Sequence, residues 1–149
     1  MKNFKGHFLS IVFLALIAYM VAPKVINMVQ GPAPLPTMFA HNYNIERATI
    51  QSETTGKPIL ILVTADWCPP CQALKKGALS DPKVTDWVNA NMIPVYLEDG
   101  ADQDQIRLLP VRSYPTTIVL KDGQILGQFT GNKSASAFLS RIKDSVSSL

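Results

Sequence analysis

Cys68 and Cys71 are the two cysteines of this 149-residue chain, and two prolines separate them in the run Trp67-Cys68-Pro69-Pro70-Cys71. The run lies where an apolar, β-branched segment ends and a segment of helical composition begins. The unpaired N–H groups and the dipole of a helix N-terminus stabilise negative charge, so a thiol there ionises more easily. We therefore predict that Cys68 is the exposed, attacking thiolate. Cys71, one turn later, is predicted to be the shielded partner that can form a disulfide with it.

Three other uses of the cysteine pair are less consistent with the sequence. A structural disulfide that closes so short a loop restricts the unfolded chain very little. A metal site would need two more ligands, and the histidines, His7 and His41, are far from the pair in sequence. Covalent haem attachment requires a histidine after the second cysteine, where this chain has Gln72. The pair is therefore interpreted as a redox dithiol, with no cofactor expected beyond the Cys68–Cys71 disulfide.

The order of hydrophobic periodicities around the cysteines predicts an α/β domain. Strands are predicted at 58–65, 92–97, 116–121 and 124–129, and helices at 45–55, 69–79, 83–90 and 134–146. The first two strands are apolar runs joined through helices, which requires a right-handed crossover between parallel strands. The last two strands are joined by Asp122-Gly123, a hairpin turn sequence. The prediction is a mixed sheet of about four strands flanked by helices.

The N-terminal region has the composition of a membrane-targeting helix. Residues 8–22 carry no charge and follow Lys2 and Lys5. Fifteen helical residues reach about 22 Å, short of a ~30 Å hydrocarbon core, which favours a cleaved signal peptide. However, no small-x-small cleavage site directly follows the run, and residues 25–29 could extend the span if Lys24 reaches the interface. An uncleaved anchor is the preferred interpretation, and a cleaved signal is the alternative. Either way, the positive-inside rule places the rest of the chain outside the cytoplasm.

Composition divides the chain into a signal or anchor at 1–29, a proline-rich linker at 30–38 and a folded domain at 39–149. The linker contains three prolines and is expected to be stiff and extended. The formal net charge of +3 comes from the lysines of the first thirty residues, so the remaining chain is neutral. A nucleic-acid binder needs a basic face on its folded part, and nothing in this charge balance indicates one, so no nucleic-acid partner is expected.

From about residue 45 onward the sequence resembles the thioredoxin superfamily. The specific element is the Trp-Cys-Pro-Pro-Cys motif after a strand, and Tyr114-Pro115-Thr116 is similar to the cis-proline loop of that family. The resemblance implies a thioredoxin-like fold in which Pro115 packs opposite the dithiol. It also implies that Trp67, Tyr114 and Pro115 contact the substrate, with Cys68 and Cys71 as the catalytic residues.

A narrower resemblance is to the C-terminal periplasmic thioredoxin-like domain of the thiol:disulfide interchange protein DsbD. It is carried by Gly56-Lys57-Pro58, Ala65-Asp66 and Ser80-Asp81-Pro82. This resemblance implies a membrane-anchored, periplasmic thiol:disulfide oxidoreductase that reduces protein disulfides, including those of cytochrome maturation. With two cysteines the chain cannot relay electrons across a membrane, so a separate membrane electron donor is expected. The alternatives are a dithiol oxidase or isomerase, and a non-catalytic assembly module of an envelope complex.

Two positions depart from these families. Thioredoxins usually have a buried Asp six residues before the first cysteine, where this chain has Leu62, and the DsbD-like domain has a Glu where this chain has Lys75. Proton transfer to Cys71 must therefore use another group, and water, Asp66 and the Glu98–Asp99 pair are the candidates. Lys75 is interpreted as an exposed helix lysine or as a charge that favours the thiolate.

Overall fold

The computed structural model describes residues 10–22 and 31–147, in two compact units, residues 1–32 and 33–149. In the first unit, residues 10–22 form a helix with exposed apolar side chains such as Phe13 and Leu14. Within the described ranges, no helix combines the length and the apolar character needed to cross a membrane. The predicted lysine flank, Lys2 and Lys5, and residues 23–30 lie outside the described residues.

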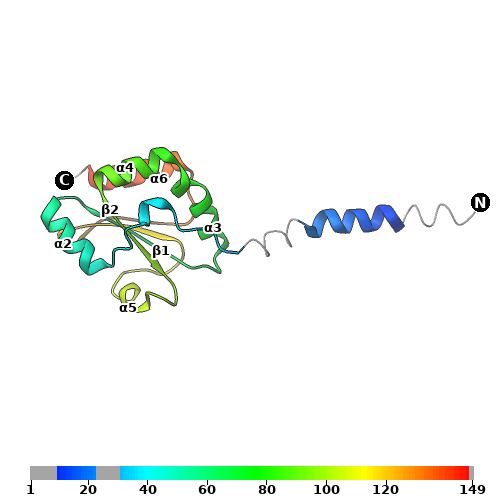
Figure 1. The fold of residues 1–149 in the computed structure, drawn as a ribbon, viewed down its shortest axis with the longest axis horizontal. Coiled ribbons are helices and arrows are strands. Elements are labelled where there is room, and N and C mark those ends of the chain that lie inside the picture. The colour runs from blue at the N-terminus through cyan, green and yellow to red at the C-terminus, as the bar shows by residue number, and fades with distance from the viewer. Residues whose placement is uncertain (1–9, 23–30, 148–149) are drawn as a thin grey trace, which may run out of the picture. The chain divides into compact units, whose positions relative to one another are not determined.

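The second unit is built on a four-stranded mixed sheet with the strand order β2-β1-β3-β4 (Figure 1). The strands are β1 (Ile59–Thr64), β2 (Ile93–Glu98), β3 (Thr116–Lys121) and β4 (Gln124–Thr130). β1 pairs in parallel with β2 and antiparallel with β3. All six residues of β1 are buried, which explains why its sequence is a continuous apolar run rather than an alternating one. The predicted four-stranded mixed sheet is confirmed.

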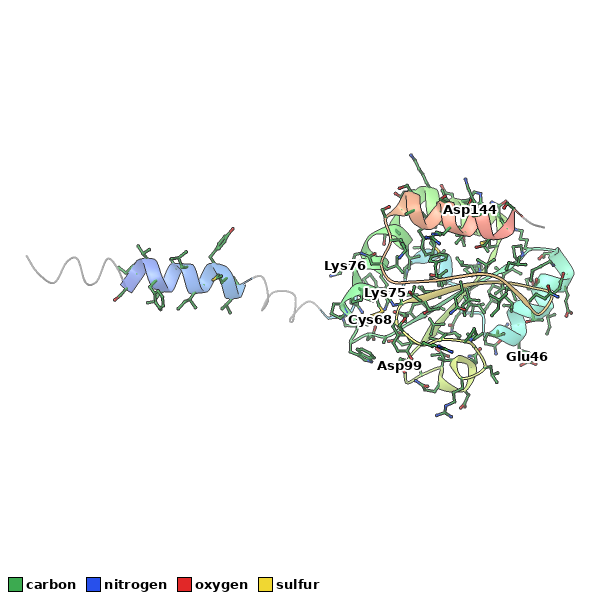
Figure 2. All side chains as sticks on the ribbon, turned by 180° about the vertical axis from the view of Figure 1, so that it is seen from behind. Glu46, Cys68, Lys75, Lys76, Asp99 and Asp144 are labelled. Carbon is green, nitrogen blue, oxygen red and sulfur yellow. A yellow bond between two sulfur atoms is a disulfide. The ribbon has the colours of Figure 1, made fainter. Side chains whose placement is uncertain are left out.

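Helices cover both faces of the sheet (Figures 1 and 2). One face packs against α3 (Pro69–Lys76), α4 (Pro82–Asn91) and α6 (Ala135–Val146), and the other against α2 (Ile45–Thr55) and α5 (Gln103–Ile106). Side chains alternate along a strand, so Leu60 and Leu62 of β1 pack in the core under α3, α4 and α6. Ile61 and Val63 pack in the core under α2 and α5. The side of β1 on which a residue lies therefore determines which helices it can meet.

The predicted helix over 69–79 divides into two elements. α3 ends at Lys76, Gly77 caps it, and Ala78–Ser80 (η2) forms a 3-10 turn before α4. The other turns follow the sequence signals: Asn44 caps α2 by accepting from the Arg47 N–H at 2.8 Å, and Asp122 and Gly123 both have positive φ in the β3–β4 hairpin.

The segment before the first long helix also packs on the domain. Thr37–Phe39 (η1) is a 3-10 turn, and Met38 and Phe39 are fully buried against the core under α4 and β2. Ala33 is buried as well, and its N–H donates to Oε1 of Gln72 in α3 at 2.5 Å. The packed part of the chain therefore extends back to Ala33, into the segment 30–38.

Phe138 joins α6 to the sheet, and its removal tests this packing. Its side chain is fully buried, with its ring edge-on to Phe129 of β4 at 5.5 Å between centroids. Because the truncation leaves a cavity, F138A is expected to lower the free energy of unfolding by about 3–5 kcal/mol in denaturant titrations. The control is L108A at an exposed leucine, which should change it by less than about 0.5 kcal/mol. A small effect of F138A would show that α6 does not dock as described.

Candidate active site

The two cysteines lie at the carboxyl end of β1, where the chain turns into α3. Cys68 is the N-cap of α3 in extended conformation, and its Sγ accepts the Cys71 N–H at 3.3 Å. Pro69 and Pro70 occupy the first turn, where a backbone N–H has no helical partner to lose. Cys68 and Cys71 form a disulfide, with their Cα atoms 5.3 Å apart. The predicted position of the pair at a helix N-terminus is confirmed.

The two sulfurs differ in what they face. In the disulfide form both cysteines are buried, with 4% of Cys68 and 1% of Cys71 exposed, so the expectation of an exposed Cys68 is wrong for this form of the protein. The reason is that Ala65, Cys71 and Tyr114 pack around it. Cys68 nevertheless lines a surface cavity of about 450 Å³, and Cys71 does not. A partner in this cavity would therefore meet Cys68 first.

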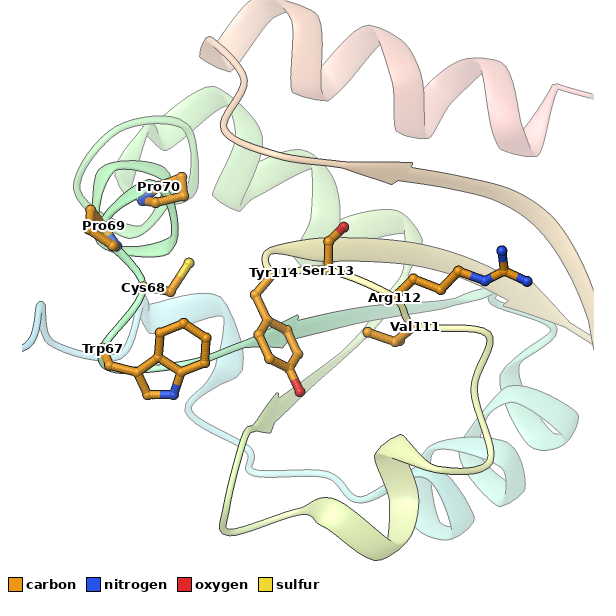
Figure 3. A pocket seen from close by; sticks show the side chains of 8 residues that line it. All are labelled: Trp67, Cys68, Pro69, Pro70, Val111, Arg112, Ser113 and Tyr114. Atoms are coloured by element: carbon orange, nitrogen blue, oxygen red, sulfur yellow. The ribbon is translucent and has the colours of Figure 1, made fainter.

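The cavity lies between the start of α3 and the loop that precedes β3 (Figure 3). Its lining residues are Trp67, Cys68, Pro69 and Pro70 on one wall, and Val111, Arg112, Ser113 and Tyr114 on the other. The Tyr114–Pro115 peptide bond is cis, as the family resemblance implied. Pro115 is buried rather than lining the cavity, and its carbonyl accepts the Gly131 N–H at 2.8 Å. Of the three predicted substrate-contacting residues, Trp67 and Tyr114 thus border the cavity with their side chains.

Asp99, directly after β2, connects the two aromatic residues of the cavity. Its carboxylate accepts the Trp67 Nε1–H at 3.2 Å, the Tyr114 hydroxyl at 3.1 Å and the Gln103 amide. The two rings meet edge-on at 5.9 Å although Trp67 is 71% exposed. Sequence reasoning considered Asp99 only as a proton carrier and missed this role. The one available signal was that β1 and β2, as parallel strands, end at the same edge of the sheet.

Lys75 is buried in α3, one turn after Cys71, so its interpretation as an exposed helix lysine is wrong. Only 3% of its side chain is exposed, because it lies under the sheet face rather than on the outer side of α3. Its Nζ forms an ion pair with Asp66 at 3.1 Å and lies 5.2 Å from the centre of the Tyr96 ring. The Tyr96 hydroxyl donates to Glu98 Oε2 at 3.2 Å. We call Asp66, Lys75, Tyr96 and Glu98 the Lys75 cluster.

The members of the Lys75 cluster shift one another's protonation. Interaction with Glu98, followed by that with Lys75, holds the pKa of Asp66 below its ordinary value. Burial, followed by the neighbouring Asp66, raises the pKa of Glu98. Burial alone would lower the pKa of Lys75, but interactions with Tyr96 and Asp66 outweigh it and raise that pKa. Lys75 therefore carries its positive charge throughout the neutral range.

Within the described part of the chain, no three His, Cys, Asp or Glu side chains are grouped to hold a metal ion. The acidic residues near the site, Asp66, Glu98 and Asp99, instead interact with Lys75, Tyr96 and the two cavity aromatics. The chemistry that the site can support with its own residues is thiol–disulfide exchange at Cys68.

A disulfide of the Cys-X-X-Cys type at the start of the helix after a central strand, opposite a cis-proline loop, defines the class of thioredoxin-fold dithiol oxidoreductases. The profile of the thioredoxin-like domain family matches residues 45–145, and the chain belongs to this family.

Relatives agree with this assignment, and solved structures share the fold. Thioredoxin of Mycobacterium tuberculosis is 30% identical over 98 residues, which cover 64% of this chain and 80% of that protein. The thiol:disulfide interchange protein DsbD of Escherichia coli is 34% identical over 104 residues, 62% of this chain but 17% of DsbD. The fold is similar to a thioredoxin from Thermus thermophilus (TM-score 0.60, 23% identity, 68% of this chain and 82% of that one). It is also similar to the DsbH oxidoreductase (TM-score 0.59, 18% identity, 70% of this chain and 82% of that one).

The link from Asp99 to Tyr114 can be tested by titration. Burial and, next, the Asp99 carboxylate raise the pKa of Tyr114, because a nearby negative charge disfavours the phenolate. D99N keeps the shape but removes the charge, so it is expected to lower the pKa of Tyr114. The change is read from phenolate absorbance against pH, with D99N/Y114F identifying the signal. D104N, at a fully exposed aspartate in the same segment, should leave the titration unchanged. An unaltered titration in D99N would show that the contact does not form in solution.

Proposed function

We propose that the protein is a membrane-tethered, extracytoplasmic reductase of protein disulfides. The observation that carries the proposal is the Cys68–Cys71 disulfide at the N-terminus of α3, with Cys68 alone of the two lining the cavity. Such a site suits a partner that approaches as an extended peptide segment, because the start of α3 forms one wall of the cavity and the loop before β3 forms the other.

The reaction proceeds from the reduced dithiol. The Cys68 thiolate attacks one sulfur of the partner's disulfide, so a mixed disulfide forms and the other partner sulfur leaves as a thiolate that takes a proton from solvent. The Cys71 thiol loses its proton and attacks Cys68. The Cys68–Cys71 disulfide forms, and the second partner sulfur leaves. The partner gains two electrons and the protein loses two, so a separate electron donor must reduce the protein again.

Thiol–disulfide exchange is supported by the similarity to DsbD, which is named a thiol:disulfide interchange protein, and reduction as its direction is the part that we propose. The tether is supported by the uncharged run 8–22 behind Lys2 and Lys5 and by the exposed apolar side chains of the helix over 10–22. Alkaline extraction of membranes from cells that make the full chain tests the tether. Retention in the membrane supports it, whereas release of a shortened chain identifies a cleaved signal.

A cysteine trap distinguishes an enzyme from a non-catalytic module. In C71S the Cys68 thiolate still attacks partner disulfides, but the mixed disulfide is not resolved and should accumulate. We expect C71S to form adducts on non-reducing gels that disappear with reductant, and C68S/C71S to form none. If C71S captures no more protein than the double variant, the enzymatic proposal fails and the assembly-module alternative stands.

The reduction potential of the Cys68–Cys71 pair, measured against glutathione, determines the direction of transfer. We expect a reduction potential of about −270 mV, the value of a reducing dithiol such as that of thioredoxin. A value near about −120 mV would identify an oxidase instead, because the pair would then accept electrons from most protein thiols. The potential is measured on the wild-type chain, with C68S as the control that cannot form the disulfide.

A further inference from the structure

Lys75 is a buried charge next to the cysteine that does not face the cavity. Cys71 and Lys75 are four residues apart in α3, which places them on the same side of the helix one turn apart. Long side chains on a helix lean toward its N-terminus, so the Lys75 side chain extends back toward the turn that holds Cys71. Both residues are almost fully buried. Figure 2 labels Lys75 and its neighbour Lys76 on α3.

Packing and stability do not explain the charge. Burying an ammonium costs several kcal/mol of hydration, and a buried ion pair seldom repays more than that cost. The partner, Asp66, has a side chain that is half exposed, which weakens the pair further. A methionine would fill the same space beside Tyr96 without the desolvation penalty. A buried lysine at this position is therefore better explained by what its charge acts on.

The sheet face that packs against α3 also carries a buried polar group without a hydrogen-bond partner. Thr64 is the last residue of β1, it is 1% exposed, and its hydroxyl has no hydrogen-bond partner among the described residues. By strand alternation Thr64 lies on the same face as Leu62, the face that packs against α3 and its core. A buried hydroxyl at the end of β1 and a buried ammonium on α3 thus lie on the two elements that the segment with Cys68 connects. A hydrogen-bond donor and a positive charge are both groups that can stabilise a negative sulfur.

We propose that Lys75 is a positioning residue for the second step of disulfide exchange, in which its ammonium favours the thiolate form of Cys71. In that step the Cys71 thiol gives its proton to solvent, its sulfur bonds to Cys68, and the partner's sulfur leaves as a thiolate and is protonated by solvent. The other ionisable groups that face Lys75 are Asp66, Tyr96 and Glu98. The inference rests on the proposed function, since it assigns a role within that reaction.

The first test measures Cys71 in isolation and needs no partner protein. In the full-length C68S chain, Cys71 is the only thiol, and its ionisation is followed by thiolate absorbance against pH, with C68S/C71S as the blank. Adding K75M is expected to raise the apparent pKa of Cys71 by about one unit or more, because a neighbouring positive charge is lost. K75R should restore it, because the charge is kept. K76M, at an exposed lysine one residue away, should leave it unchanged.

Removal of a negative charge near Lys75 should shift the pKa of Cys71 in the opposite direction. D66N removes the negative partner of Lys75 at a half-exposed position, so it is expected to lower the pKa of Cys71. This variant also keeps the test decisive if K75M fails to fold, as checked by circular dichroism and thermal unfolding. An unchanged pKa in K75M, equal shifts in K75M and K75R, or a raised pKa in D66N would overturn the proposal.

The second test follows the reaction itself. At neutral pH, the mixed disulfide that forms when the reduced protein's Cys68 attacks the disulfide of an oxidised model peptide should persist about tenfold longer in K75M than in wild type, and as briefly in K76M as in wild type. A wild-type chain that forms no mixed disulfide would contradict the proposed function. The titration of Cys71 in C68S would still decide the role of Lys75, so the two failures are distinguishable.

Discussion

The rest of the site depends on the junction between β1 and α3. Each residue of β1 is buried between two helical layers, so the end of this strand is fixed from both faces of the sheet. The chain then leaves the sheet and begins α3 within a few residues, with Cys68 as the N-cap whose sulfur accepts a backbone N–H. A sulfur in that position is held by the strand behind it and stabilised as an anion by the helix ahead of it. Displacement of either element would remove both effects.

Topology brings the other site residues to this junction. β1 and β2 are parallel, so their carboxyl ends lie at one edge of the sheet, and the antiparallel β3 begins at that same edge. Three chain segments therefore meet there: Asp66 and Trp67 after β1, Glu98 and Asp99 at the end of β2, and the cis-proline loop before β3. Asp99 links two of these segments through its contacts with the aromatic rings. The cavity lies between two of these segments, the one after β1 and the loop before β3.

The sequence predicted those parts of the structure whose signals are local. The buried strand before Cys68, the hairpin at Asp122-Gly123 and the cap at Asn44 each follow from residue types within a few positions, and the structure confirms them. The break at Gly77 was missed because helical composition continues through it. The burial of Lys75 and the contacts of Asp99 were missed for a different reason.

The contacts of those two residues depend on partners 9 to 32 positions away in sequence, after β1, on β2 and on the loop before β3, and no periodicity encodes such pairings. Leu62, which stands where thioredoxins usually have a buried Asp, is a second position whose surroundings the sequence could not predict. Leu62 pairs in register with Tyr96, and Lys75 lies over the ring of that tyrosine. An apolar residue on β1 thus accompanies a charged residue that reaches the same region from α3. A sequence comparison by position records two departures from the family, whereas the fold brings both residues to the same neighbour, Tyr96.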